Sequence, residues 1–227
     1  MKKSPANIKY EFSRPEVAKI KICGLTRPED IHAANAAMPD YIGFVFAESR
    51  RRVTLAQACE LRRLLHKNII SVGVFVDETI ENILAAVKSG AISAVQLHGG
   101  EDEIFIEALQ NALRDFPEKN LKIPIIKAVS ISKKGDAQAW ENSASDFLLL
   151  DRKGGGTGET FDWNLIGTVK KPFFLAGGLS AENVAHAVQQ VKPFATDVST
   201  GVEISPGIKC EEKIKNFTQL VKECGRE

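Results

Sequence analysis

The sequence predicts an α/β protein, a single-domain (β/α)8 barrel of the TIM-barrel type. Three observations favour this fold: short apolar runs alternate with capped, amphipathic segments, eight such pairs can be counted, and 227 residues suit one barrel. Apolar runs without a polar alternation are typical of parallel strands that are buried on both faces. An open doubly wound sheet is less favoured, because no Gly-x-Gly-x-x-Gly motif follows the first strand.

Residues 1–17 are polar and contain Pro5 and Pro15, so we expect an extension outside the barrel. No low-complexity linker divides the remainder, which predicts one catalytic domain over residues 18–227. The start is positively charged but lacks the apolar core of a secretory signal, so we expect a cytoplasmic protein.

Strands are expected where apolar residues run together up to a turn-forming or charged residue. The clearest case is Leu148–Leu150, which stops at Asp151 and is followed by four glycines between Gly154 and Gly158, the composition of a catalytic strand end under a glycine flap. The expected strands are 18–22, 41–46, 69–76, 94–97, 123–129, 148–151, 173–176 and 194–198.

Helix starts are indicated by capping residues. Thr26 with Glu29, and Thr54 with Gln57, have capping-box spacing, and Ser180 is an expected N-cap. The first helix opens at Thr26, and the others are expected at 54–66, 79–88, 102–114, 134–141, 162–169, 180–190 and 211–221, with 134–141 short and 162–169 weak.

The charge balance is nearly even, with 30 Lys and Arg against 29 Asp and Glu. It therefore predicts neither a nucleic-acid partner nor a membrane surface, and no apolar run approaches the ~20 residues of a membrane helix. The four cysteines are scattered, without CxxC or zinc spacing, which favours a reducing compartment and no metal site.

In barrels of this kind the active site lies at the C-terminal ends of the strands. A thiol and a carboxylate there can act as base and acid, arginines can hold an anion, and glycine-rich ends can approach a phosphate. The residues at these ends are Cys23, Arg50–Arg52, Asp77, His98, Asp151, Gly177 with Gly178, and Asp197–Gly201.

A phosphate site is the strongest inference from these residues. Gly177 and Gly178 follow the seventh strand, and Ser199, Thr200 and Gly201 follow the eighth. These two loops often build the phosphate site of such barrels, because their backbone N–H groups can point at the oxygens. The alternative is a pair of tight turns that need positive φ angles.

Each other candidate also has a structural interpretation. Asp151 could be a solvated strand end, Cys23 a small buried apolar residue, and Arg50–Arg52 a solvated turn. His98 is either a site residue or a donor that stabilises its loop. Asp197 either orients the phosphate loop or bonds a sugar hydroxyl.

Seven ordered motifs resemble the phosphoribosylanthranilate isomerases of tryptophan biosynthesis. The resemblance covers residues 19–222, and the segment after Asp151 is short for that family. The motifs are KICGLTRPED, GFVF followed by SRRRVT, VGVFVDE, VQLHGGED, LLLD with GGTGETFDW, AGGLSAENV and DVSTGVEISPGIK.

The resemblance implies an Amadori rearrangement of N-(5-phosphoribosyl)anthranilate, a phosphorylated aminosugar, by a monomer or homodimer that needs no metal or cofactor. It places the general base on Cys23 and the general acid on Asp151. It implies that Arg51 binds the anthranilate carboxylate. Because Arg50 and Arg52 flank this residue, the alignment could be shifted by one position. The implied substrate-binding residues are Arg51, Gly177, Gly178, Asp197, Thr200 and Gly201.

Three other functions compete with this one. The histidine-pathway aminoaldose isomerase would need an aspartate where Cys23 stands. Indole-glycerol-phosphate synthase would be expected to carry a catalytic lysine at a strand end, and no lysine is so placed. A barrel that only senses a phosphosugar would have no need of both Cys23 and Asp151.

Overall fold

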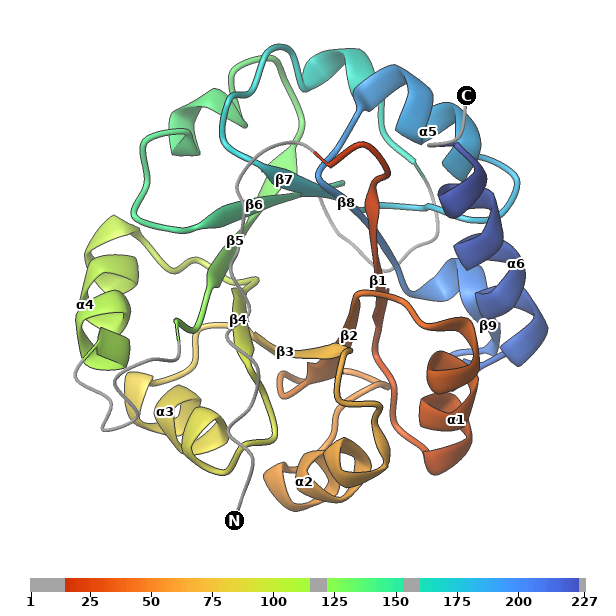
Figure 1. Cartoon of the computed structure of the whole chain (residues 1–227). Coiled ribbons are helices and arrows are strands. Elements are labelled where there is room, and N and C mark those ends of the chain that lie inside the picture. The colour runs from red at the N-terminus through yellow and green to blue at the C-terminus, as the bar shows by residue number, and fades with distance from the viewer. Residues whose placement is uncertain (1–14, 115–121, 153–159, 225–227) are drawn as a thin grey trace.

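The computed structural model describes residues 15–114, 122–152 and 160–224. Eight parallel strands form a closed barrel in sequence order, and β1 pairs with β8 to complete it (Figure 1). The predicted (β/α)8 barrel is therefore confirmed. The candidate flap between Gly154 and Gly158, and residues 1–14 of the expected extension, lie outside the described residues.

The strands agree with the predicted ranges to within two residues at every end, because each apolar run is buried on both faces. They are β1 (Lys19–Cys23), β2 (Tyr41–Val45), β3 (Ile70–Phe75), β4 (Ala94–Leu97), β5 (Ile125–Ile131), β6 (Phe147–Arg152), β7 (Phe173–Leu175) and β8 (Ala195–Val198). A further hairpin after β8, formed by β9 (Glu203–Ser205) and β10 (Ile208–Lys209), was not predicted.

The described residues form six α-helices around the barrel (Figure 1). The predicted capping box of α2 is present, since Thr54 Oγ1 accepts the Gln57 N–H and the Gln57 side chain accepts the Thr54 N–H. The helices are α1 (Pro28–Ala37), α2 (Leu55–Leu64), α3 (Ile80–Lys88), α4 (Glu103–Arg114), α5 (Val184–Val191) and α6 (Glu211–Glu223).

Two predicted helix starts are wrong. The cap of α1 is Arg27 rather than Thr26, and the carboxylate of Asp30 accepts the backbone N–H groups of both residues. Ser180 does not cap α5, because its N–H donates to the Asn183 side chain in a turn that delays the helix to Val184.

The predicted helices 134–141 and 162–169 are also wrong, because each contains only a short 3-10 helix, η1 (Gln138–Trp140) and η2 (Trp163–Leu165). Before η1, the Asp136 carboxylate accepts the backbone N–H groups of Ser132 and Lys133, which forms a local turn instead of a helix. The Gln138 side chain also donates to the backbone carbonyls of residues 166 and 168. These tertiary contacts hold the segment 162–169 in a non-helical conformation after η2.

Aromatic side chains fill the barrel at the N-terminal ends of its strands. The Phe174 ring centroid lies 5.3 Å from that of Tyr41, 5.6 Å from Phe147 and 5.7 Å from Phe194. This packed layer closes one end, so polar chemistry is confined to the other end of the barrel.

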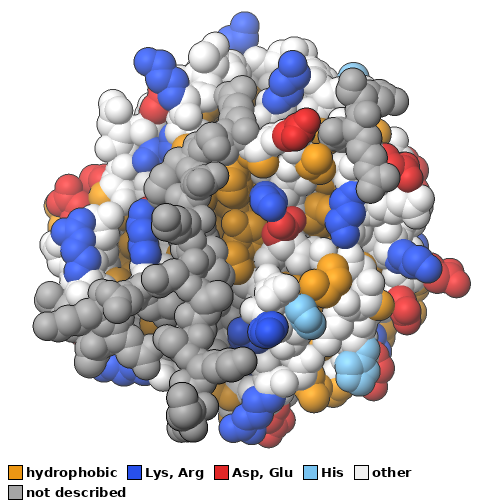
Figure 2. All heavy atoms as spheres, viewed as in Figure 1, with side chains coloured by type: hydrophobic (Ala, Val, Ile, Leu, Met, Phe, Trp, Pro, Cys, Tyr) orange, Lys and Arg blue, Asp and Glu red, His pale blue; other side chains and the backbone are white. Residues whose placement is uncertain are grey.

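No helix within the described ranges is long and apolar enough to span a bilayer. Where described residues are visible in Figure 2, acidic and basic side chains are interspersed, so this face carries no extended patch of one sign.

Candidate active site

Cys23 ends β1 with its thiol directed into the barrel mouth. The residue is buried, and a Cβ atom at Gly43 on the neighbouring strand would lie 2.7 Å from its sulfur. Ser199 Oγ, after β8, donates a hydrogen bond of 3.1 Å to the Cys23 carbonyl. The contact with Ser199 after β8 therefore fixes the backbone of Cys23, and the packing against Gly43 on β2 fixes the position of its thiol.

A buried ion pair lies next to this thiol. Lys21 is two residues earlier on the same strand face, and its Nζ is 2.9 Å from Asp197 Oδ1 on β8. The charge of Lys21 also acts on the thiol of Cys23. The sequence assigned Asp197 to the phosphate loop or to a sugar hydroxyl, and its contact with Lys21 was not predicted.

The electrostatics of this group are dominated by burial. Burial raises the pKa of the Cys23 thiol above its ordinary value, although Lys21 and Lys209 oppose the rise. Burial also acts to lower the pKa of Lys21, but the charges of Asp197 and Cys23 outweigh it and the pKa is raised. The lysine is therefore a permanent cation beside the thiol.

Arg51 is the member of the arginine run that reaches the thiol's surroundings. Its side chain covers Gly24, where a Cβ atom would lie 2.5 Å from Arg51 Cδ. Its Nε and Nη2 atoms donate to Glu203 at 2.7 and 2.8 Å. Arg50 is exposed at the surface, and Arg52 pairs with the exposed Glu48.

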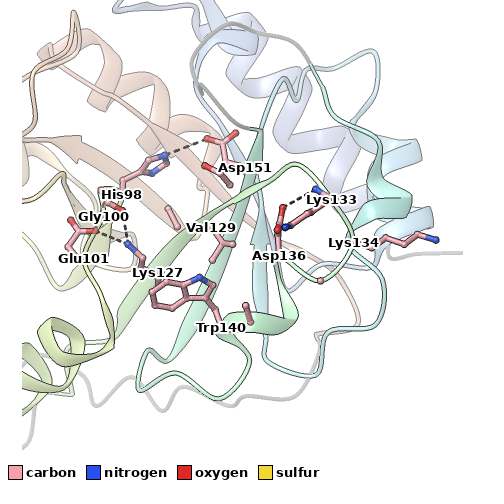
Figure 3. A pocket seen from close by; sticks show the side chains of 15 residues that line it. His98, Gly100, Glu101, Lys127, Val129, Lys133, Lys134, Asp136, Trp140 and Asp151 are labelled. Atoms are coloured by element: carbon pink, nitrogen blue, oxygen red, sulfur yellow. Dashed lines mark hydrogen bonds and ion pairs between the residues drawn. The ribbon is translucent and has the colours of Figure 1, made fainter.

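Asp151 lies on β6, partly buried, and faces His98 (Figure 3). One of its oxygens accepts the Arg152 N–H at 2.7 Å, and the other is 3.6 Å from His98 Nε2. The other ring nitrogen of His98 contacts the Gln96 side-chain nitrogen at 2.7 Å. The structure thus brings His98 to the carboxylate, where it can orient Asp151.

The two glycine-rich loops meet each other and Asp151. Gly177 has φ +84°, and a Cβ atom there would lie 2.9 Å from Asp151 Oδ1. A Cβ atom at Gly201 would lie 2.1 Å from the Leu179 carbonyl oxygen, so only glycine permits this contact between the loops. Among the described residues, the backbone N–H groups of Gly177, Gly178, Thr200 and Gly201 have no hydrogen-bond acceptor.

A cavity of about 590 Å³ opens beside Asp151, between the loops that follow β4 and β5 (Figure 3). Lys127 lies in its wall, bonded to the Gly99 carbonyl and Glu101 at 2.8 Å each, with its ammonium 5.4 Å from the Trp140 ring centroid. This lysine stands in the middle of β5, so it is not the strand-end lysine that a synthase would require.

Sequence reasoning missed Lys21, Glu203 and Lys209. Lys209 Nζ is fully buried and donates to Glu203 at 2.8 Å. A signal for Lys21 was available, because alternate residues of KIKIC place it on the same strand face as Cys23. Glu203 and Lys209 belong to the unpredicted hairpin, and although both fall within the motif DVSTGVEISPGIK, neither of them was assigned a role from the sequence.

Comparison with known proteins places the chain in a family. The family model described as N-(5'phosphoribosyl)anthranilate (PRA) isomerase matches residues 20–220. The N-(5'-phosphoribosyl)anthranilate isomerase of Endomicrobium trichonymphae is 42% identical over 208 residues, which cover 90% of this chain and 98% of that protein.

Two similar solved structures carry the same enzyme name. Phosphoribosyl anthranilate isomerase in complex with reduced 1-(o-carboxyphenylamino)-1-deoxyribulose 5-phosphate is 34% identical, with a TM-score of 0.77 and coverage of 91% and 99% of the two chains. Monomers generated from the dimeric isomerase of Thermotoga maritima are 36% identical, with the same TM-score and coverage. By its matched length, its identity to these relatives and its barrel, this chain belongs to the N-(5'-phosphoribosyl)anthranilate isomerase family.

Proposed function

We propose that the protein is a phosphoribosylanthranilate isomerase of tryptophan biosynthesis, with Cys23 as general base and Asp151 as general acid. It converts N-(5-phosphoribosyl)anthranilate to 1-(2-carboxyphenylamino)-1-deoxyribulose 5-phosphate. The observation that carries the proposal is the order of the barrel. Cys23 on β1 and Asp151 on β6 are separated by β7 and β8, whose loops offer four N–H donors for a phosphate that have no acceptor within the described part of the chain.

This arrangement suits two proton transfers at different atoms of one sugar. Protonated Asp151 gives its proton to the furanose ring oxygen, the C1–O bond breaks, and the anthranilate nitrogen forms a C1=N bond. The Cys23 thiolate then takes the proton from C2, which produces an enolamine that tautomerises to the ketone. Both steps are general acid–base catalysis by positioned groups.

The activity is tested by mixing the purified protein with freshly made substrate and following the loss of anthranilate-type fluorescence. Turnover of this substrate, and none of the histidine-pathway aminoaldose, is the expected result. Turnover of the aminoaldose alone, or binding of phosphosugars without turnover, would contradict the proposal and favour the competing functions.

We expect the substrate phosphate to bind the backbone N–H groups of Gly177, Gly178, Thr200 and Gly201. Crystals soaked in phosphate should show an anion within hydrogen-bond reach of these groups, because N–H donors without acceptors attract an anion. Sulfate should occupy the same position, since the site recognises the oxygens and the charge. An anion that binds reproducibly elsewhere, with these loops empty, would refute the assignment.

We expect Arg51 to bind the anthranilate carboxylate. Arg51→Ala should lower kcat/KM by roughly 10- to 150-fold, the effect of losing a charge-assisted hydrogen bond of about 1.5–3 kcal/mol. Arg52→Ala is the matched control, because Arg52 pairs with Glu48 at the surface. A larger loss in Arg50→Ala or Arg52→Ala than in Arg51→Ala would shift the assignment by one residue.

The remaining assignments are proposals of the same standing. Asp197 is a substrate-binding residue at the end of β8, where Lys21 holds its carboxylate. The catalytic domain spans residues 18–227, with residues 1–17 outside it, and the protein acts in the cytoplasm. The dimeric Thermotoga maritima relative supports a homodimer as one of the two oligomeric states expected.

A further inference from the structure

We propose that Glu203, held by Lys209, is a positioning residue that sets the orientation of Arg51 and thereby the enzyme's selectivity for a carboxylate on the substrate's aromatic ring. The inference rests on the proposed function, because it takes Arg51 as the carboxylate's partner.

The first step is the geometry of the guanidinium. The Glu203 carboxylate accepts hydrogen bonds from Nε and Nη2 of Arg51, so one edge of the planar guanidinium group is occupied. Nη1 has no acceptor among the described residues. The edge formed by Nη1 and the second Nη2 hydrogen therefore remains, and it has the geometry that binds a carboxylate through two parallel hydrogen bonds.

The second step is the rigidity of Glu203. Its side chain is 5% exposed, and its Oε1 also accepts Lys209 Nζ at 2.8 Å. Lys209 is anchored in turn to the Ser199 carbonyl at 3.0 Å. Since Ser199 also bonds the Cys23 carbonyl, a continuous set of contacts relates the guanidinium plane to the catalytic strand end.

The net charge around Arg51 also favours a carboxylate ligand. A single carboxylate paired with Arg51 would neutralise it and oppose the approach of a second carboxylate. Here two cations, Arg51 and Lys209, share Glu203, and one positive charge is left for a ligand. Burial alone would raise the pKa of Glu203, but the hydrogen bonds from Arg51 and Lys209 outweigh it and hold the pKa below the ordinary value, so the carboxylate stays ionised.

The exposed pair of Arg52 and Glu48 offers a matched contrast. It joins the next arginine to a glutamate, but the side chains are 53% and 88% exposed. Such a surface pair has little effect on stability and does not fix the orientation of a side chain. Glu48→Gln is therefore the control for Glu203→Gln.

The experiment compares two inhibitors on each variant. One is reduced 1-(o-carboxyphenylamino)-1-deoxyribulose 5-phosphate, and the other is the same compound with a phenylamino group that lacks the carboxylate. Glu203→Gln should weaken binding of the carboxylated compound roughly 10-fold, the loss expected when a charge-assisted contact is misaligned, and should leave the phenylamino compound within about twofold. In the Glu203→Gln enzyme the KM for the substrate should rise by a larger factor than the kcat falls. Glu48→Gln should change neither inhibitor affinity, nor KM, nor kcat.

Equal weakening of both inhibitors by Glu203→Gln, or no weakening of either, would overturn the inference. If Glu203→Gln does not fold by circular dichroism, Glu203→Asp serves instead, because it keeps the charge and shortens the side chain by one methylene. Retained selectivity in that variant would contradict positioning. A wild type that does not prefer the carboxylated inhibitor would refute the role of Arg51 itself, and absence of turnover in the fluorescence assay would refute the proposed function separately.

Discussion

Cys23→Ala is expected to lower kcat by at least about 100-fold while the barrel stays folded, because a positioned general base contributes ~10²–10⁴-fold. Alanine is smaller than cysteine and fits the space beside Gly43, so the loss of activity should come from the missing thiol and not from a change in the fold. Steady-state turnover with freshly made substrate, together with a melting curve, measures both quantities. Cys59→Ala, at a partly buried cysteine of α2, is the matched control and should retain activity.

The pH profile gives a second test of the thiol. Thiolate forms as the pH rises, and burial raises the pKa of Cys23, so the ascending limb of kcat/KM should lie on the alkaline side of an ordinary cysteine. The limb should disappear in Cys23→Ala, and Cys23→Ser should not restore turnover, since a hydroxyl is hardly ionised near neutral pH. Near-normal turnover by Cys23→Ala would exclude the thiol as base and make His98 or Asp77 the next candidates.

Asp151→Asn is expected to lower kcat by a comparable factor, at least about 100-fold. The amide has the shape of the carboxyl group and preserves the packing against Gly177, but it cannot deliver a proton to the ring oxygen. Single-turnover measurements on the purified variant would separate the chemical step from product release.

The control for this substitution is Asp102→Asn. Asp102 accepts the Phe105 N–H at the start of α4, and asparagine caps a helix as well as aspartate does. If Asp151→Asn kept more than about a tenth of wild-type kcat, Asp151 would not be the general acid, and His98, 3.6 Å away, would be the residue to test.

The strands could be predicted because their burial leaves a local trace. A run such as Leu148–Leu150 is apolar without alternation, and such runs located the ends that carry Cys23 and Asp151. The helices were harder to predict where a side chain offered the backbone another partner. The turn around Asp136 and the bonds from Gln138 replaced two expected helices with 3-10 turns.

The site was predictable only where a residue's role follows from its place at a strand end. The run Arg50–Arg52 was singled out in this way and the resemblance then selected Arg51, but its partner Glu203 lies 152 positions away in the sequence and reaches it through a hairpin with no apolar pattern. Lys21 was missed for a different reason. A lysine within an apolar strand only interrupts the apolar pattern, and it gains a role in the site once its counter-ion Asp197 is known.

The seam between β1 and β8 has a consequence for the newly made chain. Cys23 is made soon after Lys21, but part of its surroundings comes from much later in the sequence, with Ser199 176 positions after it. At ~5–20 residues per second, translation separates the two by roughly 10–35 s. During that interval Lys21 is already present, but the closed barrel that buries the thiol has not formed and the charge of Lys209 is missing, so the thiol is more exposed to oxidants than in the folded protein. A chaperone that covers β1 would thus protect the proposed general base as well as the fold.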